Sequence, residues 1–360
     1  MFRTENEFVG WLQALLASRK MGRTGPTRRQ GGVKLGIGDD AALVAVRTGF
    51  ELILTTDMSI EDVHFTRGLH PARAVGHRSL ARSLSDVAAM GGVPRYALVS
   101  LAITEEAGRA WISGFYAGLQ ALARRFGVRL VGGDTAVVPG RTFIDVLVAG
   151  EVPRGKALRR SGASAGDLIF VSGPPGLSAL GLRLVQSGRR GSSKASHVGQ
   201  PLLAVSPKAQ ARVPVLLARK AVQAHLYPEP RCALGRFLSS RGLASALIDL
   251  SDGLSTDLDR LLTASGVGAR VWAAKIPGPA LAEAADSLQL ALNGGEDYQL
   301  LFTVPQRAMS RLPSRFQGQP LYQIGEIEAP RGVRLVTPEG KVQTLVPGGW
   351  DHFRSGTGRP

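Results

Sequence analysis

Two kinds of apolar pattern alternate along most of this chain. Residues 51–56 (ELILTT) and 96–103 (YALVSLAI) are short apolar runs that include β-branched residues, and such runs are typical of strands. Between them, apolar residues recur at helical spacing over residues 72–90, and Gly91 and Gly92 mark the end of that helix. Because strand and helix patterns follow each other, we predict an α/β (α+β) fold and exclude an all-helical or all-β one.

The alternation continues to about residue 150. Thr104 and the two glutamates after it predict an N-cap for a helix that ends at Phe126, before Gly127. Residues 128–132 and 142–150 again have the composition of strands.

The pattern then restarts, and we expect a boundary near Pro153 that separates domains 1–153 and 154–360. Two domains agree with the usual size of about 150 residues per domain. In the second domain we predict strands at 167–173, 246–250, about 270–274 and 298–304, and helices at about 177–187, 207–222, 231–241 and from Leu254.

The charge balance is strongly basic, with 44 Lys and Arg against 28 Asp and Glu, a net charge of +16. A nucleic-acid-binding protein is one explanation of such a charge. However, the cations are scattered in pairs, many of them in the glycine-rich stretches 19–32 and 187–199, and aromatic residues make up only 6%. We therefore favour a solvated basic surface that attracts small anionic substrates, and we do not expect nucleic acid as the main partner.

Compartment signals are few. The single cysteine, Cys232, cannot form an intramolecular disulfide, which is typical of a reducing compartment. The N-terminal residues lack the basic start and long apolar run of a secretory signal, and no run of 18 apolar residues occurs. We expect a cytoplasmic protein without a membrane segment.

Several common catalytic signatures are absent from the sequence. It contains no GxxxxGK[ST] phosphate loop, no HExxH and no HRD/DFG pair. Its six histidines and one cysteine do not have zinc-site spacing. These absences disfavour a P-loop or protein kinase and a zinc enzyme, and a covalent catalytic triad finds no support.

Acidic residues instead occur beside glycine or other small residues, and Asp57 and Asp249 lie at or near the ends of predicted strands, where functional side chains gather in α/β sheets. Mg²⁺ prefers oxygen ligands and is commonly bound by one or two carboxylates together with substrate phosphates. We expect these acids to converge around divalent ions that serve phosphoryl transfer. The six clusters are GIGDDAA (36–42), TTDMSIEDVHF (55–65), LSDVAAMGG (84–92), GGDT (132–135), IDLSDGLSTDLD (248–259) and GGEDYQLLF (294–302).

Each cluster also has an ordinary structural explanation. Ser251 or Asp252 would cap the helix that follows, Asp86 would lie on a solvated helix face, and His64 would be a satisfied histidine. Turns would explain the clusters around Asp40, Asp134 and Glu296. Six such clusters in one chain exceed what turns require.

In this order, the clusters resemble thiamine-monophosphate kinase, of the superfamily that includes aminoimidazole ribonucleotide synthetase and selenophosphate synthetase. The resemblance extends from GIGDDAA to GGWDHF (348–353). The ordered motifs between them are TTDMSIEDVHF, LSDVAAMGGVP, GGDT, GKALRRSGASAGD, YPEPR, IDLSDGLSTDL, GGEDYQLLF and IGEI.

The resemblance implies a Mg²⁺-dependent transfer of the ATP γ-phosphoryl group to thiamine monophosphate, which gives thiamine diphosphate and ADP. It also implies two domains of the aminoimidazole ribonucleotide synthetase type. Residues 1–153 would bind ATP and Mg²⁺ and pair their sheet with that of a second copy in a homodimer. Residues 154–360 would form a mixed sheet with flanking helices and complete the ATP and substrate site.

Site residues follow from the resemblance position by position. Several Mg²⁺ ions would be bound by Asp40, Thr55, Thr56, Asp57, Asp86, Asp134, Asp249 and Asp252. ATP would be contacted by Tyr116, Gly133, Asp134, Arg160 and Ser251, and thiamine monophosphate by His64, Glu296 and Trp350. The residues assigned to catalysis are Asp57, Asp86, Asp134 and Arg160.

The chain departs from the family pattern at three positions: the family usually has glycine at Asp62, asparagine at Ser83 and lysine at Arg78. Two rival functions stay open. One is another ATP-dependent enzyme of the same superfamily with a different acceptor, such as a ribonucleotide cyclo-ligase, which GGEDYQLLF and GGWDHF disfavour. The other is a non-catalytic basic protein that binds nucleotide or nucleic acid.

Overall fold

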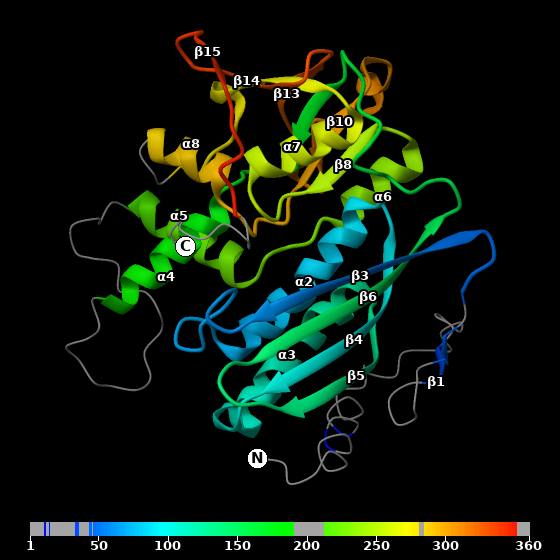
Figure 1. Ribbon diagram of the computed structural model, residues 1–360, viewed down its shortest axis with the longest axis vertical. Coiled ribbons are helices and arrows are strands. Elements are labelled where there is room, and N and C mark those ends of the chain that lie inside the picture. Colours follow the sequence, from blue (N-terminus) through cyan, green and yellow to red (C-terminus); the bar gives the residue numbers. More distant parts are fainter. Residues whose placement is uncertain are drawn as a thin grey trace. The chain divides into compact units, whose positions relative to one another are not determined.

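The computed structural model describes Trp11, Ala14 and residues 33–35, 43–44, 46–190, 212–280 and 284–350 (Figure 1). The chain divides into two compact units. The first contains residues 1–83 and 93–155, and the second contains residues 84–92 and 156–360. The short segment 84–92 therefore groups with the second unit although it lies within the sequence of the first. Within the described residues, no helix has both the length and the apolarity needed to cross a membrane.

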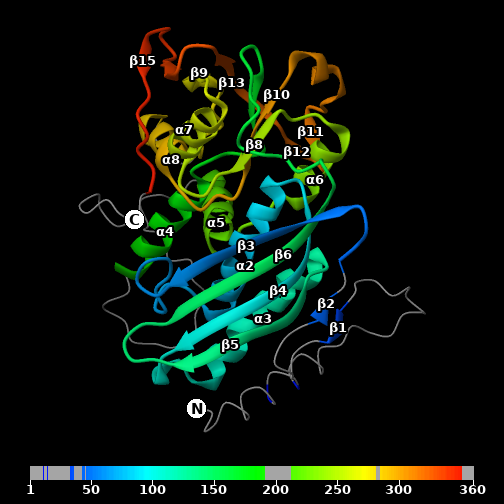
Figure 2. The same cartoon turned by 45° about the vertical axis from the view of Figure 1, so that its right-hand side comes forward.

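The first unit is built on a four-stranded sheet with helices on one face (Figure 2). The strand order is β3-β6-β4-β5; β6 is antiparallel to both of its neighbours, and β4 and β5 are parallel. The elements are β1 (Val33–Leu35), β2 (Leu43–Val44), β3 (Phe50–Ile60), α2 (Ala72–Ala89), β4 (Val93–Ile103), η1 (Glu105–Ala107), α3 (Gly108–Phe126), β5 (Arg129–Val137) and β6 (Phe143–Pro153).

Successive strand residues point to opposite faces of this sheet. On β6, Ile144, Val146 and Val148 are buried on the helix face, where the Ser83 hydroxyl of α2 donates a hydrogen bond to the Val146 carbonyl at 2.7 Å. We call the opposite side the outer face. Leu54 of β3 pairs with Ala149 of β6 there and is 62% exposed. One face of the sheet therefore forms a core, and the other carries exposed apolar side chains.

The helix predicted to begin at Thr104 starts differently from the expectation. A 3₁₀ turn, η1, precedes α3, and Thr104 makes no side-chain capping bond. Its hydroxyl instead accepts a hydrogen bond from Arg67 at 2.7 Å. The predicted end is confirmed, because Gly127 has a left-handed backbone (φ 68°) and its N–H bonds the carbonyls of the last turn.

The second unit contains a seven-stranded mixed sheet of order β15-β14-β9-β13-β7-β10-β8. All neighbouring pairs are antiparallel except β14 and β9. Its strands are β7 (Leu168–Val171), β8 (Ala246–Asp249), β9 (Gly268–Trp272), β10 (Leu300–Val304), β13 (Tyr322–Glu328), β14 (Gly332–Val336) and β15 (Val342–Thr344). Two short strands, β11 (Arg315–Phe316) and β12 (Gln319–Pro320), form a separate two-stranded sheet. The helices are α4 (Leu177–Arg190), α5 (Arg212–Leu226), α6 (Cys232–Arg241), α7 (Leu254–Ser265), η3 (Ala273–Lys275), α8 (Ala284–Asn293) and η4 (Gln306–Arg311).

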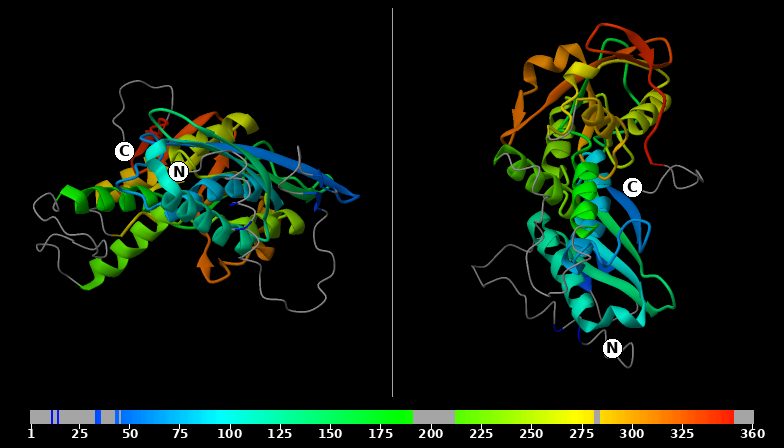
Figure 3. Two further views of the ribbon diagram at one scale, coloured as in Figure 1. Left: turned by 90° about the horizontal axis from the view of Figure 1, so that it is seen from below. Right: turned by 90° about the vertical axis from the view of Figure 1, so that its left-hand side faces the viewer.

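Helices α4 and α5 lie side by side in this unit (Figure 3). The predicted strands of the second domain correspond to β7, β8, β9 and β10. The predicted helices correspond to α4, α5, α6 and α7; α5 is described from Arg212, and residues 207–211 of its predicted span lie outside the described residues. Residues 322–328, 332–336 and 342–344 were not predicted as strands.

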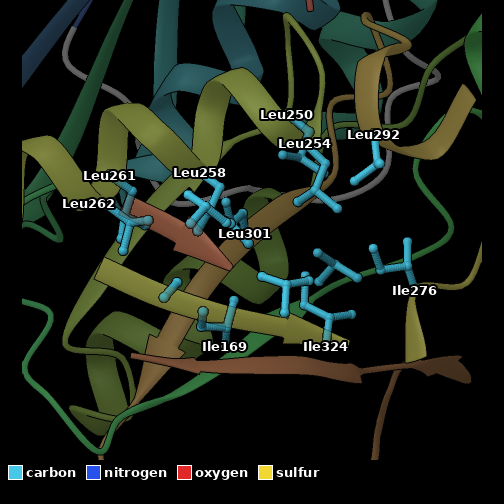
Figure 4. Packing of buried hydrophobic residues seen from close by; sticks show 14 of the residues in the cluster. Ile169, Leu250, Leu254, Leu258, Leu261, Leu262, Ile276, Leu292, Leu301 and Ile324 are labelled. Atoms are coloured by element: carbon cyan, nitrogen blue, oxygen red, sulfur yellow. The ribbon is translucent and has the colours of Figure 1, made fainter. Parts of the chain in front are cut away.

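The core of the second unit fixes the position of α7. Its apolar residues Leu254, Leu258 and Leu261 recur at helical spacing and are fully buried. They pack over the sheet near Ile169 and Leu301 (Figure 4). Since burying one leucine side chain contributes roughly 1.5–3 kcal/mol, this face holds the first turn of α7 firmly beside the end of β8.

Candidate functional site

Two of the acidic motifs, IDLSDG and GGEDY, meet the GGW motif within the second unit, at the loop between β8 and α7. The main-chain N–H of Glu296 donates to the Ser251 carbonyl at 2.7 Å, and that of Trp350 donates to the Asp252 carbonyl at 2.9 Å. The N–H of Tyr298 bonds the Leu250 carbonyl at 2.8 Å. Main-chain hydrogen bonds thus bring together four predicted site residues from distant parts of the sequence.

Glycines make these close approaches possible. A Cβ atom on Gly295 would lie 2.6 Å from the Ser251 carbonyl oxygen, and one on Gly349 would lie 2.0 Å from that of Asp252. Only a residue without a side chain fits at either position. In addition, Glu296 and Tyr298 have left-handed backbones, with φ of 64° and 50°. Such strain in non-glycine residues is common at functional sites.

The expectation that Ser251 or Asp252 caps the following helix is wrong. The N-cap residue of α7 is Gly253, which has no side-chain cap. Instead, the buried carboxylate of Asp257 reaches back from the first turn and accepts the N–H groups of Ser251, Asp252 and Gly253 at 3.0, 3.0 and 3.2 Å. Asp257 therefore holds the conformation of the loop.

A guanidinium bridges two acids of this loop. Arg260 Nη1 donates to Asp252 Oδ2 at 2.5 Å and to Asp257 Oδ1 at 2.8 Å. Burial, together with the negative charge of Asp252, raises the pKa of Asp257 to about 6 despite its hydrogen bonds and Arg260. Arg260 orients the Asp252 carboxylate by holding one of its two oxygens, as a partner behind a metal ligand does. Sequence reasoning missed Asp257 and Arg260, although the spacing of acids in LSTDLD was a signal for the former.

Glu296 and Asp297 have different roles. Asp297 is buried and accepts the N–H groups of Gly176 and Ser178 at 2.5 and 2.9 Å, so it caps the start of α4. Burial raises the pKa of Asp297 to about 7, and the neighbouring Glu296 adds to that rise. Asp297 anchors the loop, and Glu296 remains partly exposed beside it.

Asp249, the last residue of β8, is 4% exposed. It accepts a 2.7 Å hydrogen bond from the Ser85 hydroxyl. Ser85 belongs to the last part of α2, which groups with the second unit, and Asp86 follows it directly. This bond places the segment of Asp86 next to Asp249.

In the first unit, strand alternation separates three adjacent predicted ligands. Asp57 lies on the helix face, 3.9 Å from Arg82 Nε of α2, and Thr55 shares this face by alternation. Thr56 points to the outer face, where its hydroxyl donates to Asp145 Oδ1 at 2.6 Å. A metal ion bound by the Asp57 carboxylate on the helix face could therefore contact Thr56 through its main-chain atoms but not through its hydroxyl.

Asp134 also lies on the outer face, because its register partner Ser100 pairs in turn with Asp145. Its carboxylate accepts the N–H of Thr135 at 2.8 Å. Two strands separate β5 from β3, which carries Asp57, at about 4.8 Å per strand step. The sheet of one chain thus does not bring Asp57 and Asp134 together, contrary to the expected convergence of all the acids.

The predicted ATP contacts are placed differently from one another. Tyr116 is only 1% exposed and packs in the first unit against Phe115, with ring centroids 5.2 Å apart, so its ring belongs to the core. Gly133 (φ 152°) is required where a Cβ atom would lie 1.9 Å from the Val99 carbonyl oxygen. The Arg160 side chain is exposed in the second unit.

His64 lies in the loop after β3. Its Nδ1 accepts the Ile60 N–H at 3.0 Å, which places the proton of a neutral ring on Nε2. Nearby Asp62 has φ 63° and an ion pair with Arg141 at 3.1 Å. This left-handed backbone gives a physical reason for the glycine that the family usually has there. At the two other positions that differ from the family pattern, the Ser83 hydroxyl donates a hydrogen bond to the Val146 carbonyl of β6, and Arg78 is buried with its Nη2 3.4 Å from the His64 carbonyl oxygen.

The described residues contain no group of three or more His, Cys, Asp or Glu arranged to hold a metal ion. Asp40 lies outside the described residues. The carboxylates present nevertheless fit Mg²⁺, because this ion is usually bound by one or two carboxylates, substrate phosphates and water rather than by a complete protein cage.

Comparisons with known proteins identify the family of this chain. The family model of the AIR synthase related protein N-terminal domain matches residues 38–152, and that of the C-terminal domain matches residues 164–337. Thiamine-monophosphate kinase of Salmonella typhimurium is 37% identical over 328 residues, which cover 89% of this chain and 92% of the relative. The Escherichia coli (strain K12) enzyme of the same name is 36% identical over 330 residues, with the same coverage.

Solved structures show the same fold. The crystal structure of thiamine-monophosphate kinase from Stenotrophomonas maltophilia K279a has a TM-score of 0.72 and 33% identity, covering 93% of this chain and 96% of that chain. The structure of AaThiL complexed with AMPPCP and TMP has a TM-score of 0.68 and 28% identity, covering 98% and 99%. This chain therefore belongs to the thiamine-monophosphate kinase family, within the AIR synthase related proteins.

Proposed function

We propose that this protein is a kinase that transfers the γ-phosphoryl group of ATP to thiamine monophosphate and forms thiamine diphosphate and ADP. The observation that carries the proposal is the identity of 37% over 89% of the chain to a thiamine-monophosphate kinase. The structure of AaThiL with AMPPCP, an ATP analogue, and TMP supports both substrates. The meeting of the IDLSDG, GGEDY and GGW motifs in one place supports a shared site.

Mg²⁺ would neutralise charge on the transferred phosphoryl group. We assign its binding to Asp86, Asp249 and Asp252 in the second unit and to Asp40, Asp57 and Asp134 in the first, where Asp57 and Asp134, on opposite faces of the sheet, would bind different ions. Asp249 is oriented by Ser85 and Asp252 by Arg260. Thr55 and the main chain of Thr56 lie beside Asp57 and complete this set. Ser251, Gly133 and Arg160 would contact ATP, since main-chain N–H groups and an exposed guanidinium both suit phosphate oxygens.

The acceptor site would contain Glu296 and Trp350, which are held next to each other by the β8–α7 loop. Thiamine carries a positively charged thiazolium ring. A carboxylate and an indole face attract such a cation by charge pairing and cation–π interaction. His64, whose Nε2 carries the ring proton, would donate a hydrogen bond to the acceptor phosphate.

No general base is needed for this transfer. The attacking oxygen belongs to a phosphate that is already ionised at neutral pH, so the chain has to position two polyanions and offset their charge. Rigid anchoring of the site loops by Asp257 and Asp297 serves that positioning.

We also propose a homodimer formed through the first unit. The outer face of its sheet exposes Leu52, Leu54, Met58 and Phe143, with exposed fractions of 46, 62, 55 and 43%. Apolar side chains gathered on one sheet face mark an interaction surface. Leu54→Glu should then give a monomer in sedimentation analysis, and Val342→Glu, at a 59% exposed valine of the second unit, serves as the control that stays dimeric. A wild-type monomer would contradict the proposal.

The test of function is incubation of the purified protein with ATP, Mg²⁺ and thiamine monophosphate, followed by measurement of thiamine diphosphate. Product should form only when Mg²⁺ is present. Consumption of ATP with another acceptor, such as a formylated ribonucleotide amidine, but not with thiamine monophosphate would point to a different enzyme of the superfamily. Binding of unrelated DNA with steep salt dependence and no phosphoryl transfer would support the nucleic-acid alternative.

A further inference from the structure

Arg231 ends the motif YPEPR (227–231), to which the proposed function gives no role. It directly precedes α6 and is partly buried. Burial lowers the pKa of its guanidinium, and the charge of Glu229 opposes this shift. A guanidinium stays charged at neutral pH even so, so the fold keeps a positive charge in a partly dehydrated position.

The guanidinium is held by one side chain. Arg231 Nε donates to Gln299 Oε1 at 2.9 Å, and the same oxygen accepts the Ser172 hydroxyl at 2.9 Å. Ser172 Oγ in turn accepts the Leu300 N–H at 2.8 Å. A Cβ atom on Gly173 would lie 2.6 Å from Gln299 Oε1, so a side chain at this position would displace the amide from where it is bonded. Gln299 thus fixes the direction in which the guanidinium points.

The two Nη groups of Arg231 make no comparable hydrogen bond to a side chain among the described residues. Among the described residues, no carboxylate lies within ion-pair distance of Arg231, and its Nε bond to Gln299 is its one side-chain hydrogen bond there. Burying a charge without a close counter-ion is costly. An arginine oriented through Nε and unpaired at both Nη atoms has the geometry that grips an anion with two parallel hydrogen bonds.

Two residues in contact with or adjacent to Arg231 are bonded to segments of the candidate site in the second unit. The Gln299 carbonyl accepts the Leu250 N–H at 2.8 Å, one residue before Ser251. Next to Arg231, the Cys232 thiol contacts the Leu84 carbonyl at 3.4 Å. Leu84 precedes Ser85, which donates its hydrogen bond to Asp249. Gln299 therefore connects Arg231 to the segment of the predicted ATP contact Ser251, and Cys232 connects it to the segment that bonds the predicted metal ligand Asp249.

We propose that Arg231 is a phosphate-binding residue whose two Nη groups contact oxygens of a phosphate ester or polyphosphate bound in this site. The inference rests on the proposed function for the identity of the ligands, which are ATP and thiamine monophosphate. Arg231 supplies a fixed positive charge near the acidic residues of the site. Without it, metal ions alone would have to offset their negative charge. Lysine could not replace it fully, because an ammonium group lacks the planar fork.

The experiment measures dissociation constants by calorimetry for three separate probes: AMPPCP, thiamine monophosphate and inorganic tripolyphosphate. Arg231→Gln should weaken binding of at least one probe by about 10- to 100-fold, the usual effect of losing hydrogen bonds to a charged group. Which probe is affected tells whether the nucleotide or the acceptor phosphate is bound. Arg183→Gln is the matched control, since Arg183 is an exposed arginine paired with Asp286, and it should change none of the three constants.

Two further variants separate binding from support of the fold. Arg231→Lys should retain part of the affinity, and Gln299→Leu should weaken the same probe as Arg231→Gln because it removes the orienting oxygen. If Arg231→Gln fails to fold in a thermal scan, these two variants decide the outcome. A folded Arg231 variant with all three constants within twofold of wild type overturns the proposal, as does a wild type that binds none of the probes. A wild type that binds phosphates through Arg231 but forms no thiamine diphosphate would overturn the proposed function alone.

Discussion

The two units set the direction of their functional side chains by different means. In the first, strand alternation decides: Asp57 faces the helices, and Thr56 and Asp134 face the outer side. In the second, main-chain hydrogen bonds among loops decide, and they hold Ser251, Asp252, Glu296 and Trp350 together. A regular strand separates neighbouring residues, whereas a bonded loop gathers distant ones.

The largest effects should come from removing one carboxylate in each unit. Asp57→Asn and Asp86→Asn should each leave the fold nearly intact but lower turnover by about 100-fold or more, because each removes negative charge at a proposed Mg²⁺ ligand. Circular dichroism checks the fold and a coupled assay for ADP measures turnover. Near-wild-type turnover in Asp57→Asn alone would show that the first unit does not take part in the chemistry.

A smaller effect should follow from crowding the loop cluster. In Gly349→Ala the new Cβ atom would meet the Asp252 carbonyl oxygen at 2.0 Å, so the main chain that carries Trp350 must move. Overpacking of this kind costs roughly 1–3 kcal/mol, and we expect the KM for thiamine monophosphate to rise about tenfold. Gly188→Ala, where nothing lies within 4 Å, is the control. An unchanged KM in Gly349→Ala would show that the loop bonds do not position the acceptor site.

Removing the indole tests the acceptor site directly. Trp350→Ala should raise the KM for thiamine monophosphate roughly two- to thirtyfold, the range of cation–π energies, and should change the KM for ATP less. Steady-state kinetics with each substrate varied separately give both constants. If the two KM values rose equally, Trp350 would support the loop as a whole and would not be a specific contact of the acceptor.

The fold was largely predictable because apolar periodicity reports burial directly. The helix over 72–90 and the strand over 96–103 were confirmed as α2 and β4. Strand β13 was not predicted, because residues 322–328 mix glutamates and a glycine with their apolar residues. A strand in the middle of a sheet tolerates such residues when its neighbours cover them, and those neighbours cannot be read from local sequence.

The directions of the predicted site residues could be read from the sequence only in part. The opposite directions of Thr56 and Asp57 follow from alternation alone, whereas the separation of Asp57 from Asp134 depends on strand order. The functions of Asp257 and Arg260 depend on hydrogen bonds to main-chain N–H groups and to Asp252, which leave no pattern in a single sequence. The same holds for Asp297, for which no role was predicted from the sequence and which accepts two N–H groups at the start of α4.

The smallest effect concerns the pH dependence of stability in the loop cluster. The pKa of Asp297 is raised by burial to about 7, above its value in the unfolded chain of about 4. The folded state therefore binds an extra proton between these pH values, and the contribution of Asp297 to stability, complete below about pH 4, is lost as the pH rises through 7. Asp297→Asn cannot titrate, so its free energy of unfolding, measured with urea, should fall less steeply between pH 4 and 7. The difference in slope should approach one proton, about 1.4 kcal/mol per pH unit. Ser178 and Gly176 still find one amide oxygen in the variant, which keeps it folded enough for the comparison. Parallel slopes for wild type and variant would mean that Asp297 is ionised in the folded protein, and that the hydrogen bonds from α4 outweigh its burial.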